Sequence, residues 1–159
     1  MKKVNLAPRS AGFLIVSRES PQRVALALTA KGKLVLPKGH LEEGESDLDA
    51  AKREVMEEIG IDLDLHGDTH PTFKYSMSYL VSARNYPVEI TQGAPKVEKL
   101  VTLFLAQVAP DVPVHQTAEA SIHWVEIGGS EWDGICSNRP DLVGPLSALK
   151  TGLASWDSP

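Results

Sequence analysis

Residues 39–61 read GHLEEGESDLDAAKREVMEEIGI, and this stretch decides the fold. Ser46 is a favourable helix N-cap, with Asp49 three residues later in a variant of the capping box, and Gly60 is well placed to end the helix. Apolar side chains recur between them at three- and four-residue spacing, which predicts a helix with one buried face. They are Leu48, Ala51, Val55 and Ile59. The polar, glycine-containing residues Lys38 to Glu45 predict a loop before this helix.

Strands are predicted on both sides of the helix, because the flanking segments are either rich in Val, Leu, Ile and Ala or alternate apolar with polar residues. They are Ser10–Arg18, Arg23–Ala30, Leu34–Leu36, Phe73–Val81, Val97–Val108 and Ile122–Ile127. Residues 85–99 look like a long connection that contributes to a substrate pocket or lid. Gly144-Pro145, followed by Leu146, Leu149 and Leu153, predicts a short helix with proline in its first turn. We therefore expect an α+β fold, an α/β/α sandwich with a mixed sheet, one strong helix and a C-terminal helix.

The composition fits one domain over residues 1–159. Hydrophobic residues make up 42% and charged residues 23%, as in ordinary globular proteins. A formal net charge of −5 argues against a broad nucleic-acid-binding surface, and no apolar stretch reaches the length of a membrane span. Cys136 is the only cysteine, which excludes an intramolecular disulfide and favours a reducing, cytoplasmic setting.

Carboxylates are concentrated in and around the predicted helix. On a helical wheel, Glu54, Glu57 and Glu58 fall within an arc of roughly 100°, away from the apolar stripe. Hard divalent cations such as Mg²⁺ take carboxylate oxygens and complete their shell with water and phosphate, so this face suits such an ion. The alternative is a solvated acidic face relieved by Arg53, which can reach Glu57 at i+4.

The charge is unevenly distributed along the chain. Residues 42–64 hold ten acidic residues against Lys52 and Arg53, a local charge of −8, so the rest of the chain carries +3. The mild overall acidity therefore comes from one segment. Bound divalent cations there would reverse the sign of the local field.

The same segment resembles the Nudix box, G-x5-E-x7-R-E-U-x-E-E-x-G-U with U aliphatic. Gly39, Glu45 and the run from Arg53 to Ile61 match every fixed position at the right spacing. The resemblance implies a Nudix α/β/α sandwich over nearly the whole chain. It also implies a pyrophosphohydrolase that cleaves a nucleoside diphosphate linked to another moiety, with Mg²⁺ or Mn²⁺ as cofactor.

Roles for individual residues follow from the resemblance. It implies that Glu54, Glu57 and Glu58 are metal ligands, helped by the Gly39 carbonyl, and that Glu54 or a neighbouring Glu is the base for the attacking water. Arg53 would orient Glu54, Glu45 would hold the loop against the helix, and Gly60 would end the helix.

Many Nudix enzymes add a carboxylate from a later loop, several residues before an aromatic residue. Glu119 lies five residues before Trp124, where about six are expected, so it fits with a shift or bulge. Glu98 is the alternative, although it could equally be a structural ion-pair partner of Lys96 or Lys99.

The segment Leu36–Ser46 looks most like that of dinucleoside polyphosphate hydrolases of the Ap4A/Ap6A type, in which a PKGH sequence is favoured. Lys38 and His40 would then contact the polyphosphate. Tyr75 and Tyr79 share a strand face, which is more often a core face than a base-stacking platform. In the dinucleotide hydrolases that this segment resembles, a Tyr on a comparable strand stacks on adenine, so the resemblance implies that role for Tyr75 as the alternative.

Other functions remain open at this stage. A MutT-like nucleoside triphosphate pyrophosphatase, a diphosphoinositol polyphosphate hydrolase and an RNA 5′-end hydrolase are alternative enzymes, and a nucleotide sensor that binds without turnover is the alternative from another class. The expected partner is a small-molecule nucleotide, with a homodimer possible. Cys136 has no recognisable His partner in the sequence and is given no catalytic role. The histidines without metal-ligand spacing are expected to be surface or structural residues: His66, His70, His115 and His123.

Overall fold

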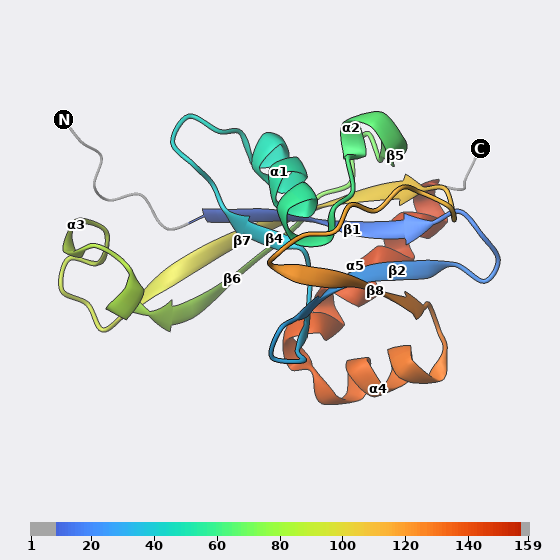
Figure 1. Cartoon of the computed structure of the whole chain (residues 1–159). Coiled ribbons are helices and arrows are strands. Elements are labelled where there is room, and N and C mark those ends of the chain that lie inside the picture. The colour runs from blue at the N-terminus through green and yellow to red at the C-terminus, as the bar shows by residue number, and fades with distance from the viewer. Residues whose placement is uncertain (1–8, 157–159) are drawn as a thin grey trace.

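The computed structural model describes residues 9–156, and these build one mixed sheet with helices on both of its faces (Figure 1). The strands are β1 (Arg9–Ser17), β2 (Arg23–Thr29), β3 (Leu34–Val35), β4 (Lys38–His40), β5 (Gly67–Thr69), β6 (Tyr75–Ser82), β7 (Lys96–Val108) and β8 (Ala120–Glu126). The helices are α1 (Asp47–Ile59), α2 (Leu63–His66), α3 (Val88–Thr91), α4 (Ser130–Asn138) and α5 (Pro140–Trp156), with a 3-10 turn η1 (Ala83–Asn85). The predicted limits at residues 1 and 159 lie outside the described range.

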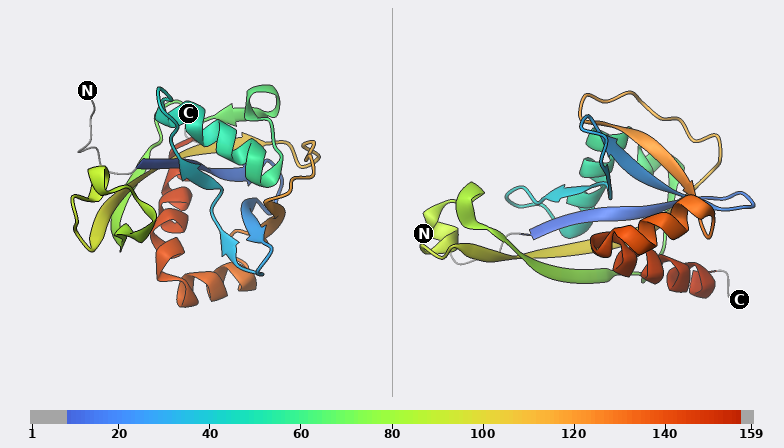
Figure 2. Two further views of the ribbon diagram at one scale, coloured as in Figure 1. Left: turned by 60° about the vertical axis from the view of Figure 1, so that its left-hand side comes forward. Right: turned by 90° about the horizontal axis from the view of Figure 1, so that it is seen from below.

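The sheet separates two apolar layers. Strand β1 pairs in parallel with β7 and antiparallel with β2 and β4, which makes the sheet mixed. Helix α1 buries Ala51 and Val55 against one face, together with Phe13. Helices α4 and α5 cover the other face, where Leu146 and Leu149 pack (Figure 2). The predicted α/β/α sandwich is confirmed.

Helix α1 begins and ends where the sequence predicts. The Ser46 side chain accepts a hydrogen bond from the Asp49 backbone N–H, and Gly60 has a φ of 74°, in the left-handed region. A Cβ at Gly60 would lie 1.8 Å from the His115 carbonyl oxygen, so this position requires glycine for both conformation and space.

The C-terminal prediction is wrong in its details. Helix α5 begins at Pro140, where a missing N–H costs no hydrogen bond, and Pro145 lies inside the helix rather than in its first turn. Helix α4 precedes it and was not predicted. Its short apolar face, Trp132 and Ile135, gives little periodic signal. Among residues 9–156, no helix is both long and apolar enough to cross a membrane.

Two further boundaries differ from the predictions. The expected loop over residues 38–45 contains strand β4, because Lys38–His40 pair with Gly12–Ser10 at the edge of β1. The expected connection over residues 85–99 is shorter. Strands β6 and β7 pair as far as Ser82 and Lys96, so only residues 83–95, with η1 and α3, form the tip of a hairpin.

Candidate active site

Strand β4 and helix α1 meet at Gly39 and Glu54. Glu54 is buried, with 9% of its surface exposed, and its carboxyl lies directly on the Gly39 backbone. A Cβ at residue 39 would be 2.2 Å from the Glu54 Cδ, a distance that real atoms do not adopt. Glycine at this box position therefore makes room for the carboxylate.

Glu58 lies one turn further along α1 and is also partly buried. Its Oε1 accepts a hydrogen bond of 3.2 Å from the backbone N–H of Lys38. Burial, followed by the negative charge of Glu54, raises the pKa of Glu58 to about 7. Burial likewise raises the pKa of Glu54, although Arg53 opposes the shift. The two carboxylates thus repel each other in a poorly solvated place that would favour a bound cation.

Arg53 connects the loop, the helix and these carboxylates. Its Nε and Nη2 donate to both carboxylate oxygens of Glu45, at 2.7 and 3.0 Å. Its Nη1 lies 3.0 Å from Glu54 Oε2 and 3.2 Å from Glu57 Oε1, and Nη2 also donates to the His40 carbonyl at 3.0 Å. The hydrogen bonds from Arg53 lower the pKa of Glu45, so this bidentate pair stays ionised.

The three glutamates of the helix are not equivalent. Glu57 is exposed and faces Arg53, whereas Glu54 and Glu58 are more buried and act on each other. The predicted acidic arc therefore divides into an inner pair, Glu54 and Glu58, and an outer residue, Glu57.

Glu119 reaches this pair from the segment before β8. Its negative charge is among the causes that raise the pKa of both Glu54 and Glu58. Thr117 anchors the turn, with its hydroxyl 2.9 Å from the Glu58 carbonyl and 2.9 Å from the Ala120 carbonyl. Glu98, the alternative, is exposed on β7 opposite Leu80, and among the described residues it is not one of the charges that shift these two pKa values.

The donor set fits a hard divalent cation whose shell is completed from outside the protein. Among residues 9–156, no three His, Cys, Asp or Glu side chains are grouped so that they could hold a metal ion by themselves. Mg²⁺ usually binds through one or two carboxylates and keeps water and substrate phosphate as its other ligands. Glu54, Glu58 and the Gly39 carbonyl could provide this incomplete set.

A pocket of about 550 Å³ opens between the β3–β4 segment, β6 and the start of α5. Its lining includes Lys38, Asp141 and two residues of β6, Tyr75 and Tyr79. Gly144 leaves space for the Tyr75 hydroxyl, because a Cβ there would be 2.5 Å from it. Tyr75 is only partly buried and lines the pocket, although it also packs against the apolar core.

The structure adds Tyr86 to the residues near the predicted site. Its hydroxyl lies 3.1 Å from Nε2 of His40. The contact joins the hairpin tip to the box loop, and no local pattern in the sequence indicates it, because the two residues are 46 positions apart.

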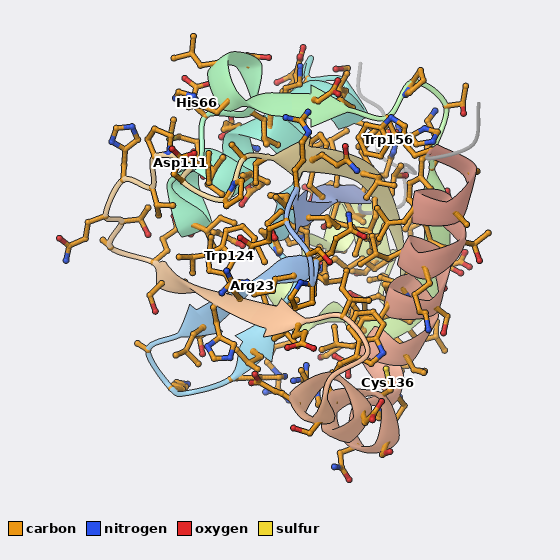
Figure 3. The ribbon with its side chains drawn as sticks, turned by 90° about the vertical axis from the view of Figure 1, so that its right-hand side faces the viewer. Arg23, His66, Asp111, Trp124, Cys136 and Trp156 are labelled. Atoms are coloured by element: carbon orange, nitrogen blue, oxygen red, sulfur yellow. The ribbon has the colours of Figure 1, made fainter. Side chains whose placement is uncertain are left out.

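The remaining histidines and the cysteine lie in other settings. His70 is buried, its Nδ1 accepts from the backbone N–H groups of Thr72 and Phe73, and its ring meets that of Trp156 at 4.9 Å. His123 pairs with Glu131 at 2.7 Å. Figure 3 shows Cys136 and Trp156 in the α4–α5 layer.

Comparison with solved structures supports the same architecture. An Ap4A hydrolase of C. elegans in a binary complex has a TM-score of 0.71 at 21% identity, covering 94% of this chain and 99% of its own. A dihydroneopterin triphosphate pyrophosphohydrolase of E. coli has a TM-score of 0.63 at 17% identity, and the match covers 94% of this chain and 97% of that one. The Nudix hydrolase RenU of M. smegmatis has a TM-score of 0.65 at 17% identity, and the match covers 94% of this chain and 88% of that one. No curated protein sequence matches the chain.

The family model for the NUDIX domain matches residues 6–129, so the chain belongs to the Nudix family and is a pyrophosphohydrolase. The sandwich, the acidic helix and the glycine under its buried carboxylate agree with this assignment. Every fixed residue of the box, from Gly39 to Ile61, is present.

Proposed function

We propose that the protein is a Mg²⁺-dependent hydrolase of dinucleoside polyphosphates such as Ap4A. The observation that carries the proposal is the position of Lys38. Lys38 is one of the residues that line the pocket with Tyr75, and its backbone N–H donates to Glu58. A polyphosphate held by Lys38 and His40 would therefore run from a nucleoside pocket to the carboxylates.

Each residue of the site has a defined task in this proposal. Glu54, Glu58 and the Gly39 carbonyl would hold Mg²⁺ or Mn²⁺, with Glu57 as the outer carboxylate. When bound, such an ion would neutralise phosphate oxygens and lower the pKa of water. Glu58, or Glu54 beside it, accepts the proton of the attacking water, and Glu119 supports this centre. Arg53 keeps Glu54 in place, and Glu45 fixes Arg53.

Tyr75 is the proposed stacking partner of a nucleobase. It lines the pocket and is half-buried, and Tyr79 lies four residues further along the same face of β6. An aromatic face of this kind binds a base without selecting its identity. Asp141 at the start of α5 also lines the pocket, with its two carboxylate oxygens bound by Arg139 at 3.0 and 2.8 Å.

A triphosphate pyrophosphatase is the second candidate, because the pocket of about 550 Å³ is large enough for one nucleoside. Diphosphoinositol polyphosphates and RNA 5′ ends are further substrates to compare. A sensor that binds without turnover is disfavoured, because all box carboxylates are present. The single domain, the cytoplasmic setting and a possible homodimer also remain part of the proposal.

A substrate panel tests this function. Initial rates with Mg²⁺ are measured for Ap4A, Ap6A, the dNTPs, ADP-ribose, diphosphoinositol phosphates and a triphosphorylated RNA end. We expect the highest kcat/KM for a dinucleoside polyphosphate. A clear preference for dNTPs would replace this proposal by the second candidate, and calorimetric binding without any hydrolysis would identify a sensor.

A further inference from the structure

The tip of the β6–β7 hairpin contacts the box loop through Tyr86 and His40. The rings meet edge to face, with centroids 5.8 Å apart and planes at 83°, in addition to the 3.1 Å contact between the Tyr86 hydroxyl and His40 Nε2. The Tyr86 backbone N–H donates to the Ala83 carbonyl at 3.0 Å, which steadies the tip. Figures 1 and 2 show the hairpin extending beyond the rest of the sheet on the side to which the β4–α1 loop projects.

The strand register places His40 among basic side chains. His40 pairs with Ser10, Ser10 with Val101, and Val101 with Met77, so these positions share one face of the sheet. Positions two residues away on the same strands share that face as well. They are Lys38 on β4, Lys99 on β7 and Tyr79 on β6.

Two lysines, Lys38 and Lys99, share this face of the sheet with His40. Lys99 is half-buried, with Nζ 6.0 Å from the centre of the Tyr79 ring. The 3.1 Å contact between the Tyr86 hydroxyl and His40 Nε2 has two possible donors, because a neutral imidazole carries its proton on either Nδ1 or Nε2.

We propose that Tyr86 is a positioning residue of the phosphate-binding site. Its hydroxyl donates to Nε2 of His40 and so leaves the Nδ1–H of His40 as a donor to a phosphate oxygen of the substrate. A neutral imidazole carries one N–H, and a hydrogen bond to one nitrogen fixes the proton on the other. Lys38 and Lys99 supply undirected positive charge, and His40 supplies a directed hydrogen bond. The substrate part of this inference rests on the proposed function.

Nitrogen NMR of the histidine side chains tests the tautomer without any substrate. The ¹⁵N shifts and the ring couplings identify which His40 nitrogen carries the proton, with His40→Ala used for assignment. We expect the Nδ1–H form in the wild type and its loss in Tyr86→Phe, which keeps the ring and removes only the hydroxyl. The Nε2–H form in the wild type would overturn the proposal.

Steady-state kinetics with Ap4A and calorimetric binding of tripolyphosphate test the consequence. In Tyr86→Phe we expect KM for Ap4A and Kd for tripolyphosphate to rise about five- to tenfold, with kcat within about twofold, because one hydrogen bond is lost from ground-state binding. Val88→Ala, an exposed change on the same tip, should behave as wild type. Tyr86→Phe should add nothing to His40→Ala, because both remove the same interaction.

The two proposals fail in different ways. Unchanged KM and Kd in Tyr86→Phe, or additive effects of Tyr86→Phe and His40→Ala, would contradict the role of Tyr86. If Ap4A is not hydrolysed at all, the dinucleotide function fails, and the tautomer and the tripolyphosphate affinity still decide the role of Tyr86.

Discussion

The carboxyl group of Glu54 occupies the space that a side chain at residue 39 would need, with 2.2 Å between its Cδ and the position of a Cβ there. Two segments of the box, fifteen positions apart in sequence, thus fit together only because one of them is glycine. The strand that carries Gly39 also brings its carbonyl and the Lys38 N–H to the carboxylate pair, so one short strand aligns the site.

Gly39→Ala should displace Glu54 and lower kcat by about 100-fold or more, because a catalytic group moved by about 1 Å loses that much. The change in unfolding free energy should be smaller than for a core truncation, since the Glu54 side chain can turn toward solvent. Gly134→Ala is the control, because a Cβ at Gly134 meets no atom within 4 Å and alanine favours its helix. Equal activity of the two variants would contradict the close fit.

Glu58→Gln should reduce kcat by about 1,000-fold or more while the protein stays folded, because the amide can neither take a proton nor bind a cation strongly. Glu43→Gln is the matched control, an exposed glutamate of the preceding loop. Activity is measured by phosphate-product release and folding by circular dichroism. Near-normal turnover of Glu58→Gln would remove Glu58 from the proposed mechanism.

The metal-free protein should become less stable as the pH rises from about 5 to 8. Glu58 has its pKa raised from the ordinary 4.5 to about 7 in the folded state, so the folded protein binds the proton more tightly than the unfolded chain does. The loss of stability that comes from ionising Glu58 is absent below the pKa of this group in the unfolded chain and complete above its pKa in the folded protein. For a half-buried, partly screened carboxyl it amounts to about 1–2 kcal/mol.

Urea unfolding in EDTA at several pH values measures how the free energy of unfolding changes with pH. Glu58→Gln should reduce this pH dependence and make the metal-free protein more stable than wild type near pH 8. Mg²⁺ should also reduce the pH dependence, because a bound cation stabilises the ionised carboxylates. If the free energy of unfolding depends on pH in Glu58→Gln as it does in the wild type, another group causes the pH dependence.

Arg53→Lys should lower activity by about 10- to 100-fold, because an ammonium group cannot hold Glu45, Glu54 and the His40 carbonyl together as the guanidinium does. The melting temperature should also fall by several degrees. Arg9→Lys is the comparison, since the Arg9–Asp47 pair at 2.6 Å is an exposed single contact. Retained activity in Arg53→Lys would indicate that charge alone suffices at this position.

The sequence predicts the strongest local features and misses those that depend on distant contacts. Helix α1 was predictable because its cap, its apolar spacing and its terminal glycine agree over one short segment. The predicted Arg53 and Glu57 pair follows from the same helical spacing.

The misses have physical causes. Strand β4 is three residues long and exists only through pairing with β1, so no periodicity marks it. Thr117 and Tyr86 reach the site from segments that tertiary folding brings there. Either Pro140 or Pro145 suits the first turn of a helix, and α5 begins at Pro140 and buries Leu142. Local pattern cannot distinguish such alternatives.

The most direct measurement is the hydrolysis of Ap4A in ¹⁸O-water with Mg²⁺, followed by mass spectrometry of the products. The account predicts two nucleotide products, one of which carries a single ¹⁸O on phosphorus, a rate that EDTA abolishes, and a kcat/KM for Ap4A above that for any dNTP. Faster release of pyrophosphate from a dNTP, or Ap4A hydrolysis that survives Glu58→Gln, would contradict it.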